Sequence, residues 1–101
     1  MTLIRKERLD ADTVQATVEI VNQLGLHARA AARFVETASR FAAEVTVANG
    51  DESVSGKSIL GLMMLAAGQG TQLTVTAAGA DAEAAIDAIA ALVAQRFHEN
   101  A

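Results

Sequence analysis

Apolar and polar residues alternate along three stretches of the chain, and this alternation is typical of half-buried β-strands. Residues 15–20 and residues 72–77 each place an apolar side chain at every second position. Residues 43–47 alternate in the same way, and the Asn49-Gly50 pair that follows them is a strong signal for a tight hairpin turn. We therefore expect residues 51–55 to return as the second, short arm of a hairpin.

Other stretches carry apolar residues at the spacing of an amphipathic helix. The spacing predicts a helix over residues 28–42. Ser58 suits the N-cap of a second helix, whose apolar run covers residues 59–65 and stops near Gly68. Asp81 is expected to cap a last helix, which opens directly after it.

The last helix has one apolar stripe that reaches as far as Phe97, and Glu83 lies in its first turn. The expected order of elements is therefore β-α-β-β-α-β-α. Four short strands with three helices on one face make a two-layer α+β sandwich. We expect residues 15–101 to form this domain. Residues 1–14 are mixed in charge and show no period, so they are expected to be a flexible N-terminal extension.

Composition excludes several classes of protein. With 101 residues, 51% of them hydrophobic, the chain is expected to form one domain with a compact core. Aromatic residues make up only 3%, with no Trp and no Tyr, which argues against stacking platforms for single-stranded nucleic acid. A net charge of −4 argues against a basic surface for duplex DNA. We therefore expect no nucleic-acid partner.

The sequence also bears on location. It has no cysteine, which excludes disulfides and thiolate metal sites and fits a reducing compartment. Residues 1–8 carry charges but lead into no apolar run, so they do not form a signal peptide. No stretch approaches the roughly 20 apolar residues of a membrane span. We expect a cytoplasmic protein without membrane insertion.

The strongest candidate for chemistry is His27, which lies where the helix over residues 28–42 begins. First-turn N–H groups, those of Ala28 and Arg29 included, lack partners within a helix and favour an anion. Guanidinium groups at Arg29 and Arg33 add positive charge. The same field disfavours the protonated ring, so the imidazole stays nucleophilic and can accept a phosphoryl group. The alternative is a simple cap or a half-buried surface histidine, and position alone favours that alternative.

Two segments carry a family resemblance: residues 24–29, Leu-Gly-Leu-His-Ala-Arg, and residues 56–68, which begin Gly-Lys-Ser-Ile-Leu-Gly. Together they resemble HPr, the histidine-containing phosphocarrier of the bacterial phosphoenolpyruvate-dependent phosphotransferase system. The resemblance covers residues 16–98. It implies an open-faced fold, in which an antiparallel four-stranded sheet is covered on one side by three helices.

In HPr proteins, the histidine that matches His27 is phosphorylated on Nδ1 by enzyme I, which takes the group from phosphoenolpyruvate. The group then passes to a sugar-specific enzyme IIA domain. Arg29 is the candidate charge partner of that phosphoryl group, although such an arginine is otherwise a solvated helix residue. No Asp or Glu lies between Asn22 and Phe34 in the sequence, so we expect no carboxylate nearby that could activate water.

One position departs from the family pattern. HPr usually continues His-Ala-Arg-Pro, whereas this chain has Ala30 after Arg29 and no proline anywhere. Losing that proline is expected to cost about 0.4–1 kcal/mol through the unfolded state. It also restores one backbone N–H at the anion site, so transfer efficiency would change slightly.

Ser58 matches the serine that an ATP-dependent HPr kinase phosphorylates in many bacteria, which makes an HPr kinase/phosphorylase a candidate partner. A phosphoserine there would add a charge of about −1.5 to −2 beside a docking surface and oppose an acidic partner. The alternative is a serine that only caps its helix. The sequence favours neither.

The helix that begins after Ser58 carries more apolar residues than one buried face can hold. The surplus predicts an exposed patch beside His27 where several partners dock in turn. The alternative is that about half of these residues are buried in the core. Gly61 costs about 1 kcal/mol against Ala inside a helix, which indicates a close approach there. The apolar residues are Ile59, Leu60, Met63 and Met64, and the candidate docking residues are Arg33, Lys57, Ile59, Leu60 and Met63.

Several functions remain open. The first is a monomeric phosphocarrier for sugar uptake and its regulation, with enzyme I and enzyme IIA domains as partners. The second is the nitrogen-branch HPr paralogue, which has a regulatory role. The third is a regulatory binding module that is not phosphorylated, which the presence of His27 and Arg29 argues against.

An enzyme is disfavoured because no acid–base pair, metal cluster or glycine-rich phosphate loop is present, and we expect no cofactor and no metal. His98 is expected to be a solvated residue near the C-terminus.

Overall fold

The computed structural model describes residues 2–101, and Met1 lies outside the described residues. The strands are β1 (Leu3–Asp10), β2 (Thr13–Glu19), β3 (Glu44–Asn49), β4 (Glu52–Ser55) and β5 (Gln72–Ala78). The helices are α1 (Ala28–Ala38), α2 (Ile59–Met64) and α3 (Ala82–Ala94), and a short 3₁₀ turn, η1, covers Arg96–His98. No helix within residues 2–101 is both long enough and apolar enough to cross a membrane.

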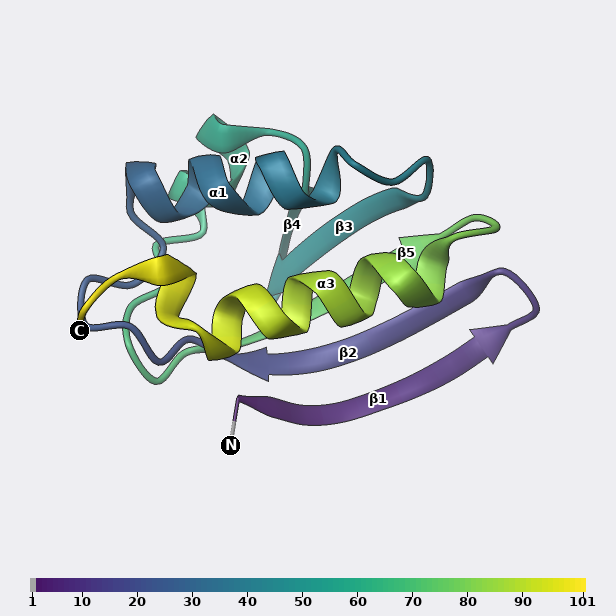
Figure 1. Ribbon diagram of the computed structural model, residues 1–101, viewed down its shortest axis with the longest axis horizontal. Coiled ribbons are helices and arrows are strands. Elements are labelled where there is room, and N and C mark those ends of the chain that lie inside the picture. Colours follow the sequence, from purple (N-terminus) through teal and green to yellow (C-terminus); the bar gives the residue numbers. More distant parts are fainter. Residues whose placement is uncertain (1) are drawn as a thin grey trace.

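The strands form one antiparallel sheet in the order β1-β2-β5-β3-β4. The three helices lie on one face of this sheet and leave its other face open (Figure 1). The predicted α+β open-faced sandwich is therefore confirmed. The predicted count of four strands is wrong, because β1 adds a fifth strand at the edge beside β2.

Strand β1 occupies much of the segment that was expected to be a flexible extension. Lys6 contacts Glu83 and Asp87 of α3 at 3.1 and 2.7 Å, and Arg8 contacts Glu83 at 2.7 Å. Most side chains of β1 are exposed, so ladder hydrogen bonds to β2 and these ion pairs hold the strand. The expectation for residues 3–10 is corrected from a flexible tail to a strand. Apolar alternation did not reveal it because the strand buries few apolar side chains.

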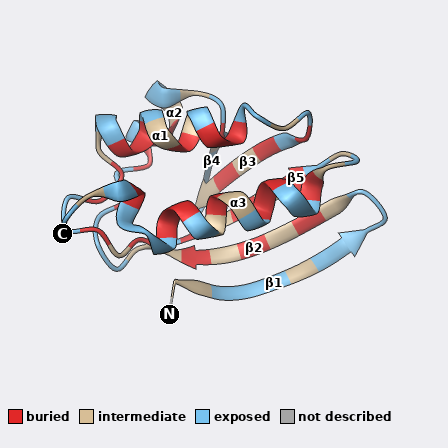
Figure 2. Cartoon of the chain, viewed as in Figure 1, coloured by how far each residue is buried: buried red, intermediate tan, exposed pale blue. Residues whose placement is uncertain are grey.

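The core lies between the sheet and the helices (Figure 2). Every second residue of β2 and β5 is buried, as their alternation predicts. The helices contribute the opposing apolar faces, and two of the three Phe side chains are fully buried. The largest fully buried side chains include Phe34, Phe97, Ile20, Leu62 and Leu73.

Helix α1 ends at Ala38, earlier than the expected end at residue 42. The backbone N–H groups of Ala42 and Ala43 donate instead to the Asp81 carboxylate, at 2.9 and 2.8 Å. Asp81 precedes α3, yet among the described residues its side chain makes no capping hydrogen bond to that helix. Asp81 therefore occupies the expected N-cap position, but its carboxylate binds the segment after α1 instead of capping α3.

Helix α2 begins as expected, since the Ser58 hydroxyl oxygen accepts a hydrogen bond from the Gly61 N–H at 3.0 Å. A Cβ on Gly61 would lie 3.1 Å from both Ser58 Oγ and Val54 Cβ, which confirms the close approach. The helix ends before the expected stop at Gly68. Ala66 already has a left-handed conformation, with φ of 51°, and this ends the helical path.

The chain leaves α3 before Phe97 and enters a left-handed turn. Arg96, Phe97 and His98 have φ angles of 54°, 54° and 64°. Phe97 is nevertheless fully buried, so it reaches the core without belonging to the helical stripe that was expected. The Gln23 N–H donates to the backbone oxygen of Ala101 at 3.0 Å. The final residues thus run back beside the loop that precedes α1 (Figure 1).

Candidate functional site

His27 is the N-cap residue of α1, and its Nδ1 accepts a hydrogen bond from the Arg29 backbone N–H at 3.3 Å. The turn before it requires Gly25, which has φ of +70° and where a Cβ would lie 2.5 Å from the Ala67 backbone oxygen. The Leu26 N–H donates to that same oxygen at 2.8 Å. The turn therefore places the His27 ring at the N-terminus of α1, and the turn itself packs against the segment that follows α2.

The other ring nitrogen of His27 faces a carboxylate that the sequence did not predict. Nε2 lies 2.5 Å from Oε2 of Glu99, a residue 72 positions further along the chain. The buried Asn22 amide donates to Glu99 Oε1 at 3.0 Å and to the Gly25 backbone oxygen at 2.7 Å. The side chain of His27 is 27% exposed and that of Glu99 only 10%. Asn22, His27 and Glu99 therefore form one hydrogen-bonded group.

These contacts define which nitrogen carries the proton. A backbone N–H can only donate, so Nδ1 must offer its lone pair to Arg29. In the neutral ring the proton then lies on Nε2, where Glu99 accepts it. Burial by itself raises the pKa of the Glu99 carboxyl, but hydrogen bonds from Asn22 and His27 and the positive charge of Arg33 outweigh it, so the net pKa is lowered. Glu99 is thus an ionised acceptor at neutral pH.

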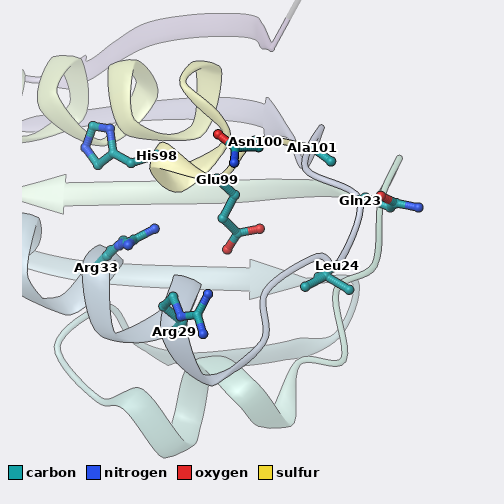
Figure 3. Close-up of a pocket in the computed structure, with 8 residues that line it drawn as sticks. All are labelled: Gln23, Leu24, Arg29, Arg33, His98, Glu99, Asn100 and Ala101. Carbon is teal, nitrogen blue, oxygen red and sulfur yellow. The ribbon is translucent and has the colours of Figure 1, made fainter.

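Two arginines of α1 flank this group in different surroundings. Arg29 is exposed and lines a pocket of about 370 Å³ together with Glu99. Arg33 is half-buried and donates to the backbone oxygen of Phe97, inside the left-handed turn. Figure 3 shows the Glu99 side chain extending from the C-terminal segment toward α1, on which Arg29 and Arg33 lie. Arg29 therefore supplies accessible positive charge, and Arg33 also holds the turn that precedes Glu99.

The expectation that no carboxylate stands beside His27 is wrong in three dimensions. The sequence around the histidine has no acidic residue, but the fold brings in Glu99 from the C-terminal segment. No local pattern indicated this contact, because it depends on the left-handed turn at residues 96–98. The weak signal was Phe97, an apolar residue whose burial directs the tail toward the site. His98 is exposed, as expected, and lines the same pocket.

Helix α2 leaves its apolar surplus in solvent, and only Leu62 of this helix is fully buried. The alternative that about half of the surplus is buried is therefore wrong. We call these residues the α2 patch: Ile59, Leu60, Met63 and Met64 are 42%, 69%, 41% and 65% exposed. Leu24, in the loop before His27, is also 69% exposed. Lys57 is exposed at the start of the patch, where its Nζ donates to the Phe41 backbone oxygen at 2.9 Å.

Comparison with known proteins points to one family. The family model for the PTS HPr component phosphorylation site matches residues 14–95, so β1 precedes the matched residues. The phosphocarrier protein NPr of Shewanella violacea is 48% identical over 86 residues, which cover 85% of this chain and 94% of that protein. The phosphocarrier protein HPr of Neisseria meningitidis serogroup A is 48% identical over 87 residues, covering 86% of this chain and 98% of that protein.

Solved structures give the same result. The crystal structure of HPr-C-His from Thermoanaerobacter tengcongensis aligns with a TM-score of 0.82 at 42% identity, covering 86% of this chain and 98% of that chain. The phosphocarrier protein HPr from Bacillus anthracis aligns with a TM-score of 0.76 at 44% identity, covering 81% of this chain and 96% of that chain. Sequence and fold therefore indicate the same group of proteins.

Proposed function

Because this chain belongs to the HPr family of phosphocarrier proteins, we propose that it takes a phosphoryl group onto Nδ1 of His27 and passes it on. The donor is phospho-enzyme I, charged by phosphoenolpyruvate in the cytoplasm, and the acceptors are enzyme IIA domains. The observation that carries this proposal is the Nδ1 lone pair at the N-terminus of α1, beside the Arg29 N–H.

The chemistry is a nucleophilic displacement at phosphorus. Nδ1 attacks with the lone pair that accepts from the Arg29 N–H, so this hydrogen bond is released as the N–P bond forms, and the bond from phosphorus to the donor breaks with its electron pair leaving on the donor. The phosphoryl oxygens are then near the first-turn N–H groups of Ala28 and Arg29, where the helix dipole favours negative charge. The exposed Arg29 guanidinium adds charge compensation.

The α2 patch is the proposed docking surface for successive partners. Its four apolar side chains are exposed, and flexible Met side chains adapt to different partner surfaces. Arg33 and Lys57 add positive charge for acidic partners. Ser58 caps α2 at the edge of this patch, so phosphorylation by an HPr kinase/phosphorylase would place new negative charge there.

The first candidate role is sugar uptake and its regulation. The nitrogen branch is the second candidate, because the chain is 48% identical to the NPr of Shewanella violacea and also 48% identical to the HPr of Neisseria meningitidis, so sequence identity favours neither branch. A binding module without phosphorylation is a weaker alternative, because its function would not require the Nδ1 placement of His27.

The test is phosphorylation in a reconstituted system, with phosphoenolpyruvate and either the sugar-type or the nitrogen-type enzyme I. We expect the intact mass to increase by one phosphoryl group, in an adduct that acid removes. The His27→Ala variant should show no increase, whereas the His98→Ala control should still gain one phosphoryl group. Equal labelling of His27→Ala would refute the assignment, and the enzyme I that reacts faster identifies the branch.

A further inference from the structure

We propose that Glu99 is a positioning residue for phosphotransfer, whose carboxylate keeps the Nε2 proton of His27 in place while Nδ1 gains and loses the phosphoryl group. The inference rests on the proposed function of His27 and adds a residue outside the sequence motif. It follows from the 2.5 Å contact between Nε2 and Glu99 Oε2, on the ring edge opposite the reacting nitrogen.

Both oxygens of the Glu99 carboxylate have defined partners. Oε2 meets His27 Nε2, and Oε1 accepts from the Asn22 amide at 3.0 Å. Asn22 is fully buried and also donates to the Gly25 backbone oxygen at 2.7 Å, in the turn that seats the histidine. The buried Asn22 amide therefore fixes the position of the Glu99 carboxylate relative to the turn that carries the His27 ring. An incidental contact at the surface would lack these additional hydrogen bonds.

The segment that delivers Glu99 is anchored on both sides. Before it, Phe97 is buried in the core and its backbone oxygen accepts from Arg33. After it, the Ala101 backbone oxygen accepts from the Gln23 N–H at 3.0 Å. The left-handed backbone conformation of residues 96–98 is unfavourable for any residue other than glycine. Such a conformation persists only where surrounding contacts hold it in place. The buried Phe97 side chain and the hydrogen bond from Arg33 hold this turn, and the turn leads directly into Glu99.

The proton on Nε2 decides how easily the phosphoryl group is released. When Nδ1 attacks phosphorus, the ring keeps its Nε2 proton and becomes a positively charged phosphoimidazolium. The Glu99 carboxylate then faces a full positive charge, which strengthens the existing hydrogen bond. When the next acceptor attacks phosphorus, the N–P electron pair returns to Nδ1 and a neutral imidazole leaves. Without the Nε2 proton, the leaving group would be an imidazolate, which is far more basic.

The same geometry explains how a carboxylate can stand in this site without promoting hydrolysis. Glu99 contacts Nε2, whereas the phosphoryl group is on Nδ1 at the other side of the ring. The carboxylate oxygens are already occupied by His27 and Asn22, so they are poorly placed to take a proton from water beside phosphorus. Among the described residues that line this pocket, the other charged or titratable groups are Arg29 and Arg33 of α1, His98 on the pocket rim and the carboxyl group of Ala101.

The first test uses Glu99→Gln, which keeps the shape of the side chain and removes its charge, with Glu44→Gln on the exposed start of β3 as the matched control. After phosphorylation, ¹⁵N NMR follows the pH at which phospho-His27 loses its Nε2 proton. We expect that midpoint to fall by about one to two pH units in Glu99→Gln, the equivalent of one hydrogen bond to a charged group. The control should leave it unchanged.

The second measurement is the rate of transfer from phospho-His27 to an enzyme IIA domain at neutral pH. Glu99→Gln should slow this transfer about ten- to a hundredfold, while the final extent of His27 labelling by enzyme I stays complete. A role in stability alone would lower the thermal midpoint and leave both the NMR midpoint and the transfer rate unchanged, which would overturn the proposal. If the unaltered protein accepts no phosphoryl group, the proposed function itself fails, and the two failures are thereby distinguished.

Discussion

The two ring nitrogens of His27 have different partners, so the two edges of the ring lie in different electrostatic surroundings. Nδ1 faces the N-terminus of α1 through the Arg29 N–H, and Nε2 faces the carboxylate of Glu99. An anion gained at Nδ1 therefore meets helix donors, while positive charge gained by the ring meets a carboxylate. Arg29 has an exposed side chain at this point, so its charge is available without a structural duty.

Arg29→Ala should slow phosphoryl transfer in both directions, because the phosphoryl group loses one charged contact worth roughly 1.5–3 kcal/mol at most. The fold should survive, since the side chain is exposed. Quench-flow transfer kinetics with enzyme I and an enzyme IIA domain measure the effect. Arg40→Ala, another exposed arginine after α1, is the control. Identical kinetics for the two variants would make Arg29 an ordinary surface residue.

Short elements place the functional groups around this residue. Helix α1 begins directly after its N-cap His27 and has Ala30 fully buried in its first turn, at the position where HPr usually has proline. Helix α2 is only six residues long, and its cap, Ser58, lies at the edge of the exposed α2 patch. A charge added at that cap changes the proposed docking surface more than it changes the core, because only Leu62 of α2 is fully buried.

Ser58→Asp should leave the thermal midpoint nearly unchanged, because Asp caps a helix about as well as Ser. It should slow phosphorylation of His27 by enzyme I, since the new charge is repelled or must be desolvated when an acidic partner docks. Labelling time courses across a salt series measure this defect, which should shrink as ionic strength rises. Ser53→Asp on the exposed β4 strand is the control. Labelling of Ser58→Asp at the unaltered rate in low salt would make Ser58 a cap only.

Contacts between distant segments hold the whole molecule together. The Asp81 carboxylate binds the backbone N–H groups of Ala42 and Ala43, which joins the end of the first helical region to the start of α3. The ion pairs of Lys6 with Glu83 and Asp87 join the first strand to the same helix. The contribution of these contacts to stability therefore depends on the charge state of their carboxylates.

The hydrogen bonds to the Asp81 carboxylate should make the free energy of unfolding depend on pH. The hydrogen bond from Ala42 lowers the pKa of Asp81 below its ordinary value of 3.8, burial opposes the shift, and the bond from Ala43 adds to it. A lowered pKa means that the carboxylate stabilises the fold above pH 3.8 and that this contribution is lost as the pH falls below that value.

Asp81→Asn should therefore lower the thermal midpoint at neutral pH, and the difference from the unaltered protein should narrow below pH 3.8. Thermal unfolding followed by circular dichroism from neutral to acidic pH measures both effects. Asp51→Asn, in the exposed turn between β3 and β4, is the control. A difference that stays constant across this pH range would show that the Asp81 charge does not contribute.

Local patterns were sufficient for the elements that bury alternate or helical stripes. The strands around Val18, Val47 and Val75 were predicted because each buries one apolar face. The cap at Ser58 and the placement of His27 at a helix start were also predicted, because both depend on neighbouring residues in the chain. Strand β1 was missed because backbone ladder bonds and ion pairs, rather than apolar burial, hold it.

By itself, the sequence determined the layered α+β fold, the histidine at the start of α1 and the apolar excess of α2, since each is a property of residues close together in the chain. Only the tertiary structure decided that Asp81 binds the segment after α1 instead of capping its own helix, and that Glu99 reaches the ring. Both contacts join residues far apart in the sequence, through a bend and a left-handed turn that no periodic pattern encodes. The contact between Nε2 and Glu99 therefore depends on the fold as a whole, whereas the position of His27 at the start of α1 could be predicted from its local motif.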